Sequence, residues 1–350
     1  MTQHPLELRP IHVVHYGLGE IGARIARLTT TQRGLQVVGG IDRDPNKAGR
    51  DLGELIGLDH PLGVPVSDDA TSILARTTPD IVIHATSSLL HDVYMQIVEC
   101  LQARANVIST CEELVYPYHK SPELVAKLDG LAKLGGATVL GAGVNPGFIM
   151  DLLPLLLTAP CLNIRSISVT RVVDATERRA TLQQRIGAGL ALDQFRDHVA
   201  RGTVRHVGLG ESIHMLADGL GWRLDRMTET IDPIVAEEWV RTPYLTVAPG
   251  QVAGLRQVAR GWLHGRGALT LTWQTAVGAR DTYDAIQIDG TPPIDLLFRG
   301  GLHGDEAAAA LILHVIPRVL AAPHGLMTVL ELPPLHYEPR PEPHLAWVRS

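Results

Sequence analysis

The sequence IHVVHYGLGEIG at residues 11–22 decides the fold of the N-terminal part of the chain. It places a G-x-G-x-x-G pattern directly after an apolar, β-branched run and at the start of an amphipathic segment. In this context the first glycine permits a tight turn, the second lets a pyrophosphate approach the backbone, and the third lets the helix pack closely on the strand. The residues expected to form this dinucleotide-binding turn are Gly17, Leu18, Gly19, Glu20, Ile21 and Gly22.

An acidic residue follows the glycine motif at a suitable spacing. Asp42 ends the second expected strand, 20 residues after Gly22, where a carboxylate can accept hydrogen bonds from the adenosine ribose hydroxyls. Asp42 favours NAD because its charge repels a 2′-phosphate. Arg43 comes next, and its side chain either turns toward that phosphate or is a solvated loop cation. We therefore expect NAD or NADP as cofactor, with dual use left open.

Short β-branched runs alternate with amphipathic stretches over residues 1–147, the first expected domain. This alternation predicts an α/β class fold, a Rossmann domain with a doubly wound parallel sheet. Helices are expected at residues 21–29, 92–103 and 122–134. Strands are expected at residues 11–16, 35–41, 64–66, 81–85, 106–110 and 137–140.

Longer strand-like segments with short turns follow, and they predict a second α+β domain at residues 148–300 built on a mostly antiparallel open sheet. One face of this sheet is expected to pack against the helices, and the other to face a substrate cleft or a partner subunit. Residues 301–350 are expected to hold a helix at 305–320 that packs back on the first domain, and then a proline-rich tail from Pro333. Strands are expected at residues 164–174, 252–264, 268–278, 282–289 and 294–298, and helices at 192–201 and 211–220.

Composition narrows the function classes. The chain has 350 residues, 45% of them hydrophobic and 19% charged, and a net charge of −6 without a basic block. Nucleic acid and membranes are therefore not expected as partners. With no signal-peptide pattern and three widely spaced cysteines, we expect a cytoplasmic protein with reduced thiols. The 16 histidines form no compact ligand motif, so we expect no metal.

Polar residues follow three of the expected strands, at the edge where ligands bind in such sheets. Ala85 and Thr86 end the fourth strand and are expected near the nicotinamide ribose. Glu112 and Glu113 follow the fifth strand, and we expect one of these adjacent acids to be functional. Asn145 lies in a glycine-rich run after the sixth strand, where its amide can orient a carbonyl or carboxamide, or the run can serve as an interdomain hinge.

The motifs GVNPGFIMDLLP (143–154), NVISTCEEL (106–114) and VDATERR (173–179), with IPRV at 316–319, together resemble the 2,4-diaminopentanoate dehydrogenases and related native amine dehydrogenases. The resemblance implies a dihydrodipicolinate-reductase-like homodimer. It also implies reversible NAD(P)-dependent deamination of an amine, or amination of a ketone with ammonia. A glutamate in the segment 110–113 would hold ammonia and handle its protons, and spacing to the Asn145 motif favours Glu113 over Glu112.

The substrate class is less constrained. Arg178 and Arg179 can form a fork for a substrate carboxylate, or they can be solvated or lie in the dimer contact. A carbonyl or imine reductase and a non-catalytic NAD(P)-binding sensor remain as alternatives to the amine dehydrogenase. The residues expected to bind substrate are Asn145, Pro146, Phe148, Met150, Arg178 and Arg179.

Overall fold

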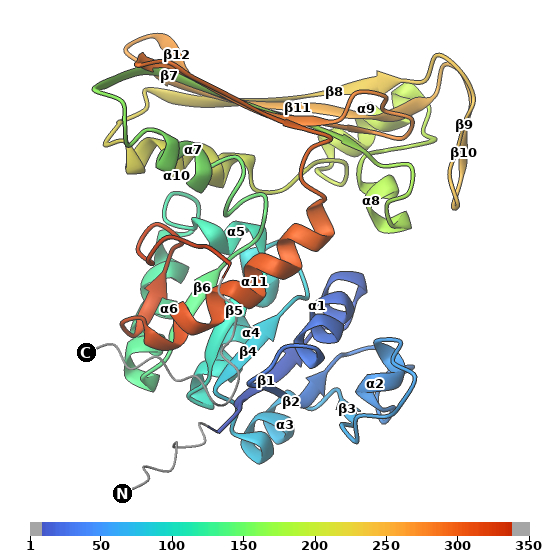
Figure 1. The fold of residues 1–350 in the computed structure, drawn as a ribbon. Helices are drawn as coiled ribbons and strands as arrows, with labels where there is room; N and C mark the ends of the chain where they lie inside the picture. Colours follow the sequence, from blue (N-terminus) through green and yellow to red (C-terminus); the bar gives the residue numbers. More distant parts are fainter. Residues whose placement is uncertain (1–8, 338–350) are drawn as a thin grey trace, which may run out of the picture. The chain divides into compact units, whose positions relative to one another are not determined.

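The computed structural model describes residues 9–337, which fall into two compact units (Figure 1). The first unit comprises residues 9–143 and 305–337, and the second comprises residues 144–304. The proline-rich tail predicted from Pro333 lies outside the described residues from position 338 onward. The first unit is therefore built from two separate stretches of the chain.

A seven-stranded sheet in the order β15-β6-β5-β4-β1-β2-β3 forms the centre of the first unit, and every strand pair in it is parallel. The predicted Rossmann fold is thus confirmed. β15 was not predicted, because it has only three residues and no periodicity can be recognised over so short a run. The strands are β1 (Ile11–Tyr16), β2 (Leu35–Ile41), β3 (Val66–Ser67), β4 (Ile81–His84), β5 (Asn106–Ser109), β6 (Thr138–Gly141) and β15 (Gly325–Met327).

Local sequence signals set the ends of the helices in this unit. The longest of the predicted N-terminal helices begins at Pro122 and is capped at its C-terminus by Gly136, whose φ of 65° is the left-handed conformation that glycine adopts most readily. The predicted C-terminal helix is present, and its residues from Asp305 onward belong to the first unit. The helices are α1 (Glu20–Thr30), α2 (Leu52–Leu55), α3 (Ala70–Thr77), α4 (Leu90–Gln102), α5 (Glu112–Val115), α6 (Pro122–Gly135) and α11 (Gly304–Ala321).

The second unit contains a six-stranded sheet in the order β14-β13-β7-β12-β11-β8. Only the pair β7 and β12 is parallel, so the predicted mostly antiparallel sheet is confirmed. The turn between β11 and β12 has both His264 and Gly265 at positive φ, 51° and 73°, as a two-residue type I′ hairpin turn requires. The strands are β7 (Asn163–Asp174), β8 (Arg226–Val235), β11 (Val252–Leu263), β12 (Arg266–Ala276), β13 (Tyr283–Thr291) and β14 (Ile294–Arg299), beside a small ribbon of β9 (Val240–Arg241) and β10 (Thr246–Val247).

The edge strand β8 was not predicted from the sequence. Half of its residues, RMTETIDPIV, are polar, and the strand includes Pro233, which a sheet tolerates at its edge. Ile231 and Ile234, which pack against the core of this unit, are three residues apart, so the run lacks the strict alternation of apolar and polar residues by which strands are recognised. The segment is recognised as a strand only by its pairing with β11, and a local sequence pattern cannot predict that pairing.

Helices lie along one face of this second sheet and build its core (Figure 1). The residues Ile213 and Leu216 of α10 are fully buried, and α10 packs on β11 and β12 through a cluster that includes Leu255 and Leu271. Burying each such side chain contributes about 1.5–3 kcal/mol. The helices of this unit are α7 (Leu152–Leu157), α8 (Ala180–Arg185), α9 (Leu192–Ala200) and α10 (Leu209–Gly219).

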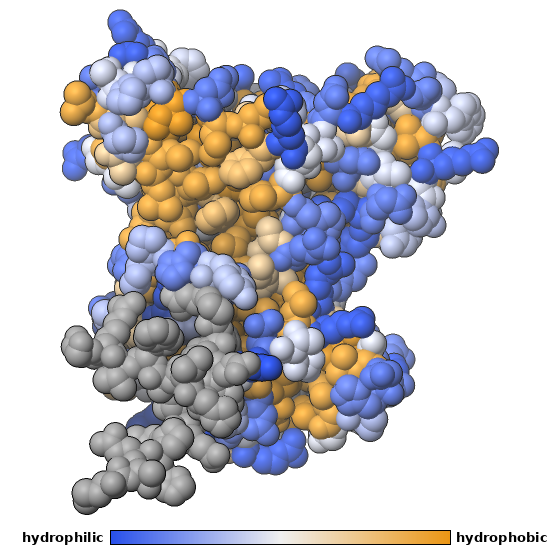
Figure 2. Space-filling view, in the orientation of Figure 1, coloured by the Kyte–Doolittle hydropathy of each residue, from blue (hydrophilic) through white to orange (hydrophobic). Residues whose placement is uncertain are grey.

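Hydrophobic side chains reach the surface over α7 and α10 (Figure 2). The helix α7 has the sequence LLPLLL, and its Leu156 is 42% exposed. This helix is only six residues long, far shorter than the roughly 20 residues that a bilayer span requires. Among the described residues, no helix is long and apolar enough to cross a membrane.

Candidate cofactor and substrate site

Each glycine of the motif meets a different steric demand. Gly17 has a φ of 93°, and a Cβ atom there would lie 2.4 Å from the Ala85 carbonyl oxygen. A Cβ on Gly22 would lie 1.9 Å from the Gly17 carbonyl oxygen, so α1 packs directly on the turn. A Cβ on Gly19, the N-cap of α1, would meet nothing within 4 Å. The turn is therefore closed on its inner side and open at the helix N-terminus, which fits a bound pyrophosphate.

Asp42 is held at the end of β2 by several donors. One carboxylate oxygen accepts from the Leu18 N–H at 2.8 Å and from the Lys47 ammonium at 2.9 Å, and the other accepts from the Asp44 N–H at 2.9 Å. Partial burial acts to raise the pKa of Asp42, but these hydrogen bonds outweigh it and hold the pKa below its ordinary value. Asp42 is therefore ionised beside the glycine turn. Arg43 is exposed, and Lys47 was not singled out in the sequence.

A buried network lies behind Thr86, just after β4. The hydroxyl of Thr86 donates to Gln96 Oε1 at 2.6 Å, and His84 Nε2 lies 2.7 Å from the same oxygen. Because that oxygen can only accept, His84 carries its proton on Nε2, and its Nδ1 accepts from the Ser109 hydroxyl at 2.9 Å. Burial lowers the pKa of His84 to about 4, so the ring is neutral at physiological pH.

This network continues to the helix that carries the two acids. The Ser109 hydroxyl oxygen accepts from the backbone N–H of Cys111 at 3.1 Å, and Cys111 is the N-cap of α5. The segment after β4 and the start of α5 are thus tied together through one neutral histidine. The roles of His84 and Gln96 in this network could not be predicted from the sequence, since neither residue belongs to a recognisable short motif.

The two adjacent acids occupy different surroundings. Glu113 is 5% exposed, accepts from the Leu90 N–H at 2.8 Å and pairs with Lys120. Both of its carboxylate oxygens are therefore engaged in bracing α5 against the loop before α4. Glu112 is the first residue of α5 and is only partly buried. The two adjacent acids therefore differ in burial, Glu112 being partly buried and Glu113 almost completely so.

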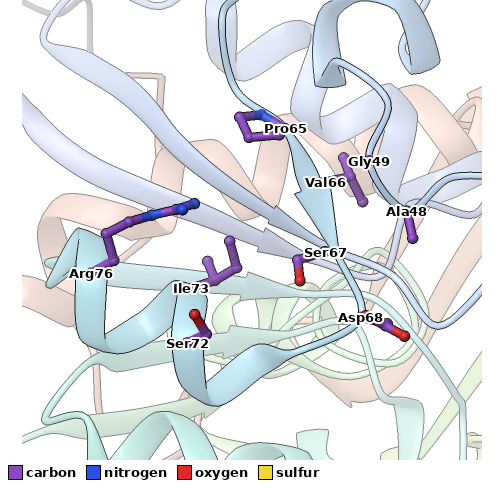
Figure 3. A pocket seen from close by; sticks show the side chains of 9 residues that line it. All are labelled: Ala48, Gly49, Pro65, Val66, Ser67, Asp68, Ser72, Ile73 and Arg76. Atoms are coloured by element: carbon purple, nitrogen blue, oxygen red, sulfur yellow. The ribbon is translucent and has the colours of Figure 1, made fainter.

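A hollow of about 290 Å³ lies between β3 and α3 in the same unit (Figure 3). Its floor adjoins Asp42, because the Asp42 N–H donates to the Ser67 carbonyl at 3.0 Å. The loop after Asp42 supplies one wall, and α3 supplies the other. The lining residues are Ala48, Gly49, Pro65, Val66, Ser67, Asp68, Ser72, Ile73 and Arg76.

In the second unit, Asn145 lies beside a buried aromatic pair. Its side-chain nitrogen is 3.1 Å from His206 Nε2, and the His206 ring lies against Trp273 with 4.4 Å between centroids. Burial first, and then the charges of nearby arginines, lowers the pKa of His206 to about 3. The neutral imidazole accepts from the Asn145 amide, whose oxygen is buried and has no hydrogen-bond partner among the described residues. That oxygen can accept a hydrogen bond from a ligand.

The run after Asn145 is fixed by a buried carboxylate. Asp151 accepts from the Gly147 N–H at 2.8 Å, the Leu152 N–H at 2.7 Å and the Ser212 hydroxyl at 2.7 Å. Burial raises the pKa of Asp151, and these donors oppose that effect. Of the other predicted substrate residues in this run, Pro146 is buried, Phe148 is half-buried against the core, and Met150 is fully buried within it.

The predicted arginine pair lies in a loop between β7 and α8. Arg178 and Arg179 are both half-buried. The side-chain nitrogen of the fully buried Gln183 donates to three carbonyls of this loop, those of Ala175 at 2.9 Å and of Thr176 and Arg178 at 3.0 Å. The loop that carries the arginines is therefore held rigidly by one side chain that sequence reasoning did not single out.

Comparison with known proteins supplies the family. Residues 148–337, more than half of the chain, match the 2,4-diaminopentanoate dehydrogenase C-terminal domain, and residues 11–111 match the dihydrodipicolinate reductase N-terminus. The chain belongs to the 2,4-diaminopentanoate dehydrogenase family. It is 30% identical over 339 residues to the 2,4-diaminopentanoate dehydrogenase of Acetoanaerobium sticklandii, covering 93% of this chain and 94% of that one.

Solved structures agree with this membership. The amine dehydrogenase of Mycobacterium smegmatis superposes with a TM-score of 0.86 at 30% identity, covering 96% of this chain and 100% of that one. GenD2 of gentamicin A biosynthesis, solved with NAD, shares the fold with a TM-score of 0.52 at 15% identity, over 85% of this chain and 75% of that one. The resemblance read from the sequence is confirmed. This member of the 2,4-diaminopentanoate dehydrogenase family is an oxidoreductase of the amine dehydrogenase type with a pyridine-nucleotide-binding fold.

Proposed function

We propose that the chain catalyses the reversible, NAD(P)-dependent oxidative deamination of a small amine, which in the other direction is the amination of a ketone with ammonia. In the amination direction a ketone, ammonia, a proton and NAD(P)H give an amine, water and NAD(P)⁺. The observation that carries the proposal is the partly buried Glu112 at the carboxyl edge of the sheet whose glycine turn fits a dinucleotide. The cofactor, when bound, supplies or accepts the hydride.

The glycine turn from Gly17 to Gly22 would hold the pyrophosphate, and Asp42 would face the adenosine ribose. Ala85 and Thr86 would lie along the nicotinamide half of the cofactor, with Thr86 oriented by Gln96. These assignments need no movement of the glycine turn, because the open space at Gly19 is already present.

We assign proton transfer to Glu112 rather than to the Glu113 favoured by spacing. Glu112 would take a proton from ammonium and later return one to the hydroxyl that leaves as water. Glu113 would serve instead as a structural brace through Leu90 and Lys120. The two acids thus receive different roles because Glu113 is almost fully buried and engaged by Leu90 and Lys120, whereas Glu112 is only partly buried.

Paired variants test this assignment. Glu112→Gln should lower kcat for ammonia-dependent amination by about 10²–10⁴-fold, the usual contribution of general acid–base catalysis, with little change in NADH affinity. Glu113→Gln should lower the unfolding temperature and leave a larger share of the activity. The proposal fails if Glu112→Gln keeps most of its activity, or if NAD(P)H is oxidised with ketones equally well without ammonia, as a carbonyl reductase would do.

We also propose that Arg178 or Arg179 binds a substrate carboxylate, and that Asn145 orients the reacting group. The rigid support that Gln183 gives to the arginine loop favours this over two mobile surface cations. The wild-type protein should then aminate 4-oxopentanoate far better than 2-pentanone, and an Arg→Ala substitution should erase that preference by removing a contact worth about 1.5–3 kcal/mol. Equal efficiency with both ketones in the wild type would reject the carboxylate site.

The proposed assembly is a homodimer, and the proposed compartment is the cytoplasm. The face of the second sheet opposite to its helices carries rows of short polar side chains on β7 and β12, such as Ser168 and Thr270, which can form a flat contact with a second copy. Three free cysteines within the described residues suit a reducing compartment. Light scattering during size-exclusion chromatography tests the dimer, which a monomeric mass would exclude.

A further inference from the structure

Lys47 places a positive charge directly at the glycine turn. Its ammonium lies 2.9 Å from Asp42 Oδ2 and 3.0 Å from the carbonyl oxygen of Leu18, the residue between the first two motif glycines. The Lys47 side chain is 23% exposed and the Asp42 side chain 12%, so the pair is partly shielded from solvent. The carboxylate that would repel a 2′-phosphate is therefore largely neutralised by a charge on its own loop.

A count of hydrogen-bonding capacity shows what the pair can still accept. An ammonium has three donors, and the Lys47 ammonium uses two, toward Asp42 and Leu18. A carboxylate has about four acceptor positions, and Asp42 uses three, for Leu18, Asp44 and Lys47. Within the part of the chain that the structure describes, one donor and one acceptor remain, which suit a phosphate oxygen and a ribose hydroxyl respectively.

The loop that carries Lys47 is held in place by its backbone. The Lys47 N–H donates to the Asp44 carbonyl at 2.9 Å, and the Gly49 N–H donates to the Val66 carbonyl of β3 at 2.8 Å. This part of the loop also forms a wall of the hollow beside β3 (Figure 3). The backbone that carries the Lys47 side chain is thus fixed, and Lys47 is partly buried, whereas the neighbouring Arg43 is exposed.

We infer that Lys47 is a specificity-determining residue: it neutralises Asp42 and donates to the 2′-phosphate, so that the site takes NADP(H) as well as NAD(H). The inference rests on the proposed NAD(P)-dependent function. It adds a cation from within the cofactor loop to the acid and the exposed arginine that mark the site in the sequence.

Binding measurements separate this role from catalysis. Titrations monitored by nicotinamide fluorescence give the Kd values of NADPH and NADH, and calorimetry with 2′,5′-ADP and ADP tests the phosphate contact without a nicotinamide. Lys47→Met should weaken NADPH and 2′,5′-ADP about 10- to 100-fold, the range for hydrogen bonds to charged groups. The Kd values of NADH and ADP should change less than about threefold. The weakening of NADPH binding should be largest at low salt, where charges are least screened.

Two further variants serve as controls. Lys47→Arg keeps the charge and should retain NADPH binding within a few-fold, and it tests the inference even if Lys47→Met folds poorly. Arg50→Met removes a cation from the same loop whose partner is Glu54 at 2.6 Å, and it should leave both cofactors unaffected.

The possible outcomes are distinct. Equal weakening of NADPH and NADH in Lys47→Met would make Lys47 only an anchor of the loop, and no change in either would remove it from the site; both results overturn the inference. A wild-type protein that binds NADH but not NADPH overturns the inference and leaves the proposed function standing. A wild-type protein that binds neither cofactor overturns both.

Discussion

Replacing His15 with leucine should stabilise the protein and flatten the acid side of its stability curve. His15 lies in β1, is fully buried, and neither of its ring nitrogens has a hydrogen-bond partner among the described residues. Burial lowers the pKa of His15 to about 3 from an ordinary value of 6.5. Between these two pH values the unfolded chain binds a proton that the native protein does not, so stability is complete above pH 6.5 and is lost as the pH falls.

The size of the effect follows from the unfolded-state pKa. A pH of 5 lies about 1.5 units below the ordinary pKa of 6.5 that the histidine has in the unfolded chain. Each unit corresponds to about 1.4 kcal/mol, so protonation of this residue lowers the free energy of unfolding of the wild-type protein by about 2 kcal/mol. His15→Leu removes that loss, and it also removes two buried polar atoms without partners, which adds about 1 kcal/mol at any pH. The variant should therefore be more stable by about 1 kcal/mol at pH 7.5 and about 3 kcal/mol at pH 5.

Urea unfolding at the two pH values measures both quantities. His12→Leu, a substitution of a half-buried histidine in the same strand, controls for the general effect of a leucine in β1. An unfolding free energy that falls between pH 7.5 and pH 5 as steeply in His15→Leu as in the wild type would refute the reasoning, since it would mean that His15 is protonated in the native state. A variant less stable than the wild type at both pH values would show that the ring is not an unsatisfied group.

Three further substitutions test other features. Gly22→Ala should abolish NADH binding by fluorescence titration and lower the unfolding temperature, because its Cβ would lie 1.9 Å from the Gly17 carbonyl oxygen; retained binding would contradict the close packing of α1 on the turn. Asp284→Ala should cost about 3–5 kcal/mol in urea unfolding, since it leaves the buried Arg171 guanidinium without its counter-charge. Ser212→Ala removes one of three donors to the buried Asp151 carboxylate and should cost about 1.5–3 kcal/mol, and a change below about 0.5 kcal/mol would show that the Ser212 hydroxyl does not stabilise that carboxylate.

The elements with strong local patterns were predictable from the sequence. The bounds of β1 and β2 coincide with the predicted residues 11–16 and 35–41, because each is a short, largely apolar run that contains β-branched residues. The roles of Gly17 and Gly22 in the turn follow from backbone sterics, which a short motif records directly.

The features that depend on long-range contacts were not predictable. Lys47 donates to Leu18, His84 pairs with Gln96, and Gln183 accepts from Thr242, each on another segment. A single sequence gives no sign of which of these partners will meet. The difference between the surroundings of Glu112 and Glu113 also depends on such a contact, since only folding brings Lys120 next to Glu113. Spacing alone treats two adjacent carboxylates as equivalent.

The strand β15 has a consequence for how the chain is made. It completes the first sheet beside β6, yet roughly 180 residues, including the whole second unit, separate the two strands in the sequence. At ribosomal rates of about 5–20 residues per second, β6 emerges about 10–40 seconds before its neighbour. During that interval the nascent chain presents an uncovered strand edge, to which another chain can pair. The inserted second unit thus sets the length of time for which a newly synthesised molecule is exposed to misassembly.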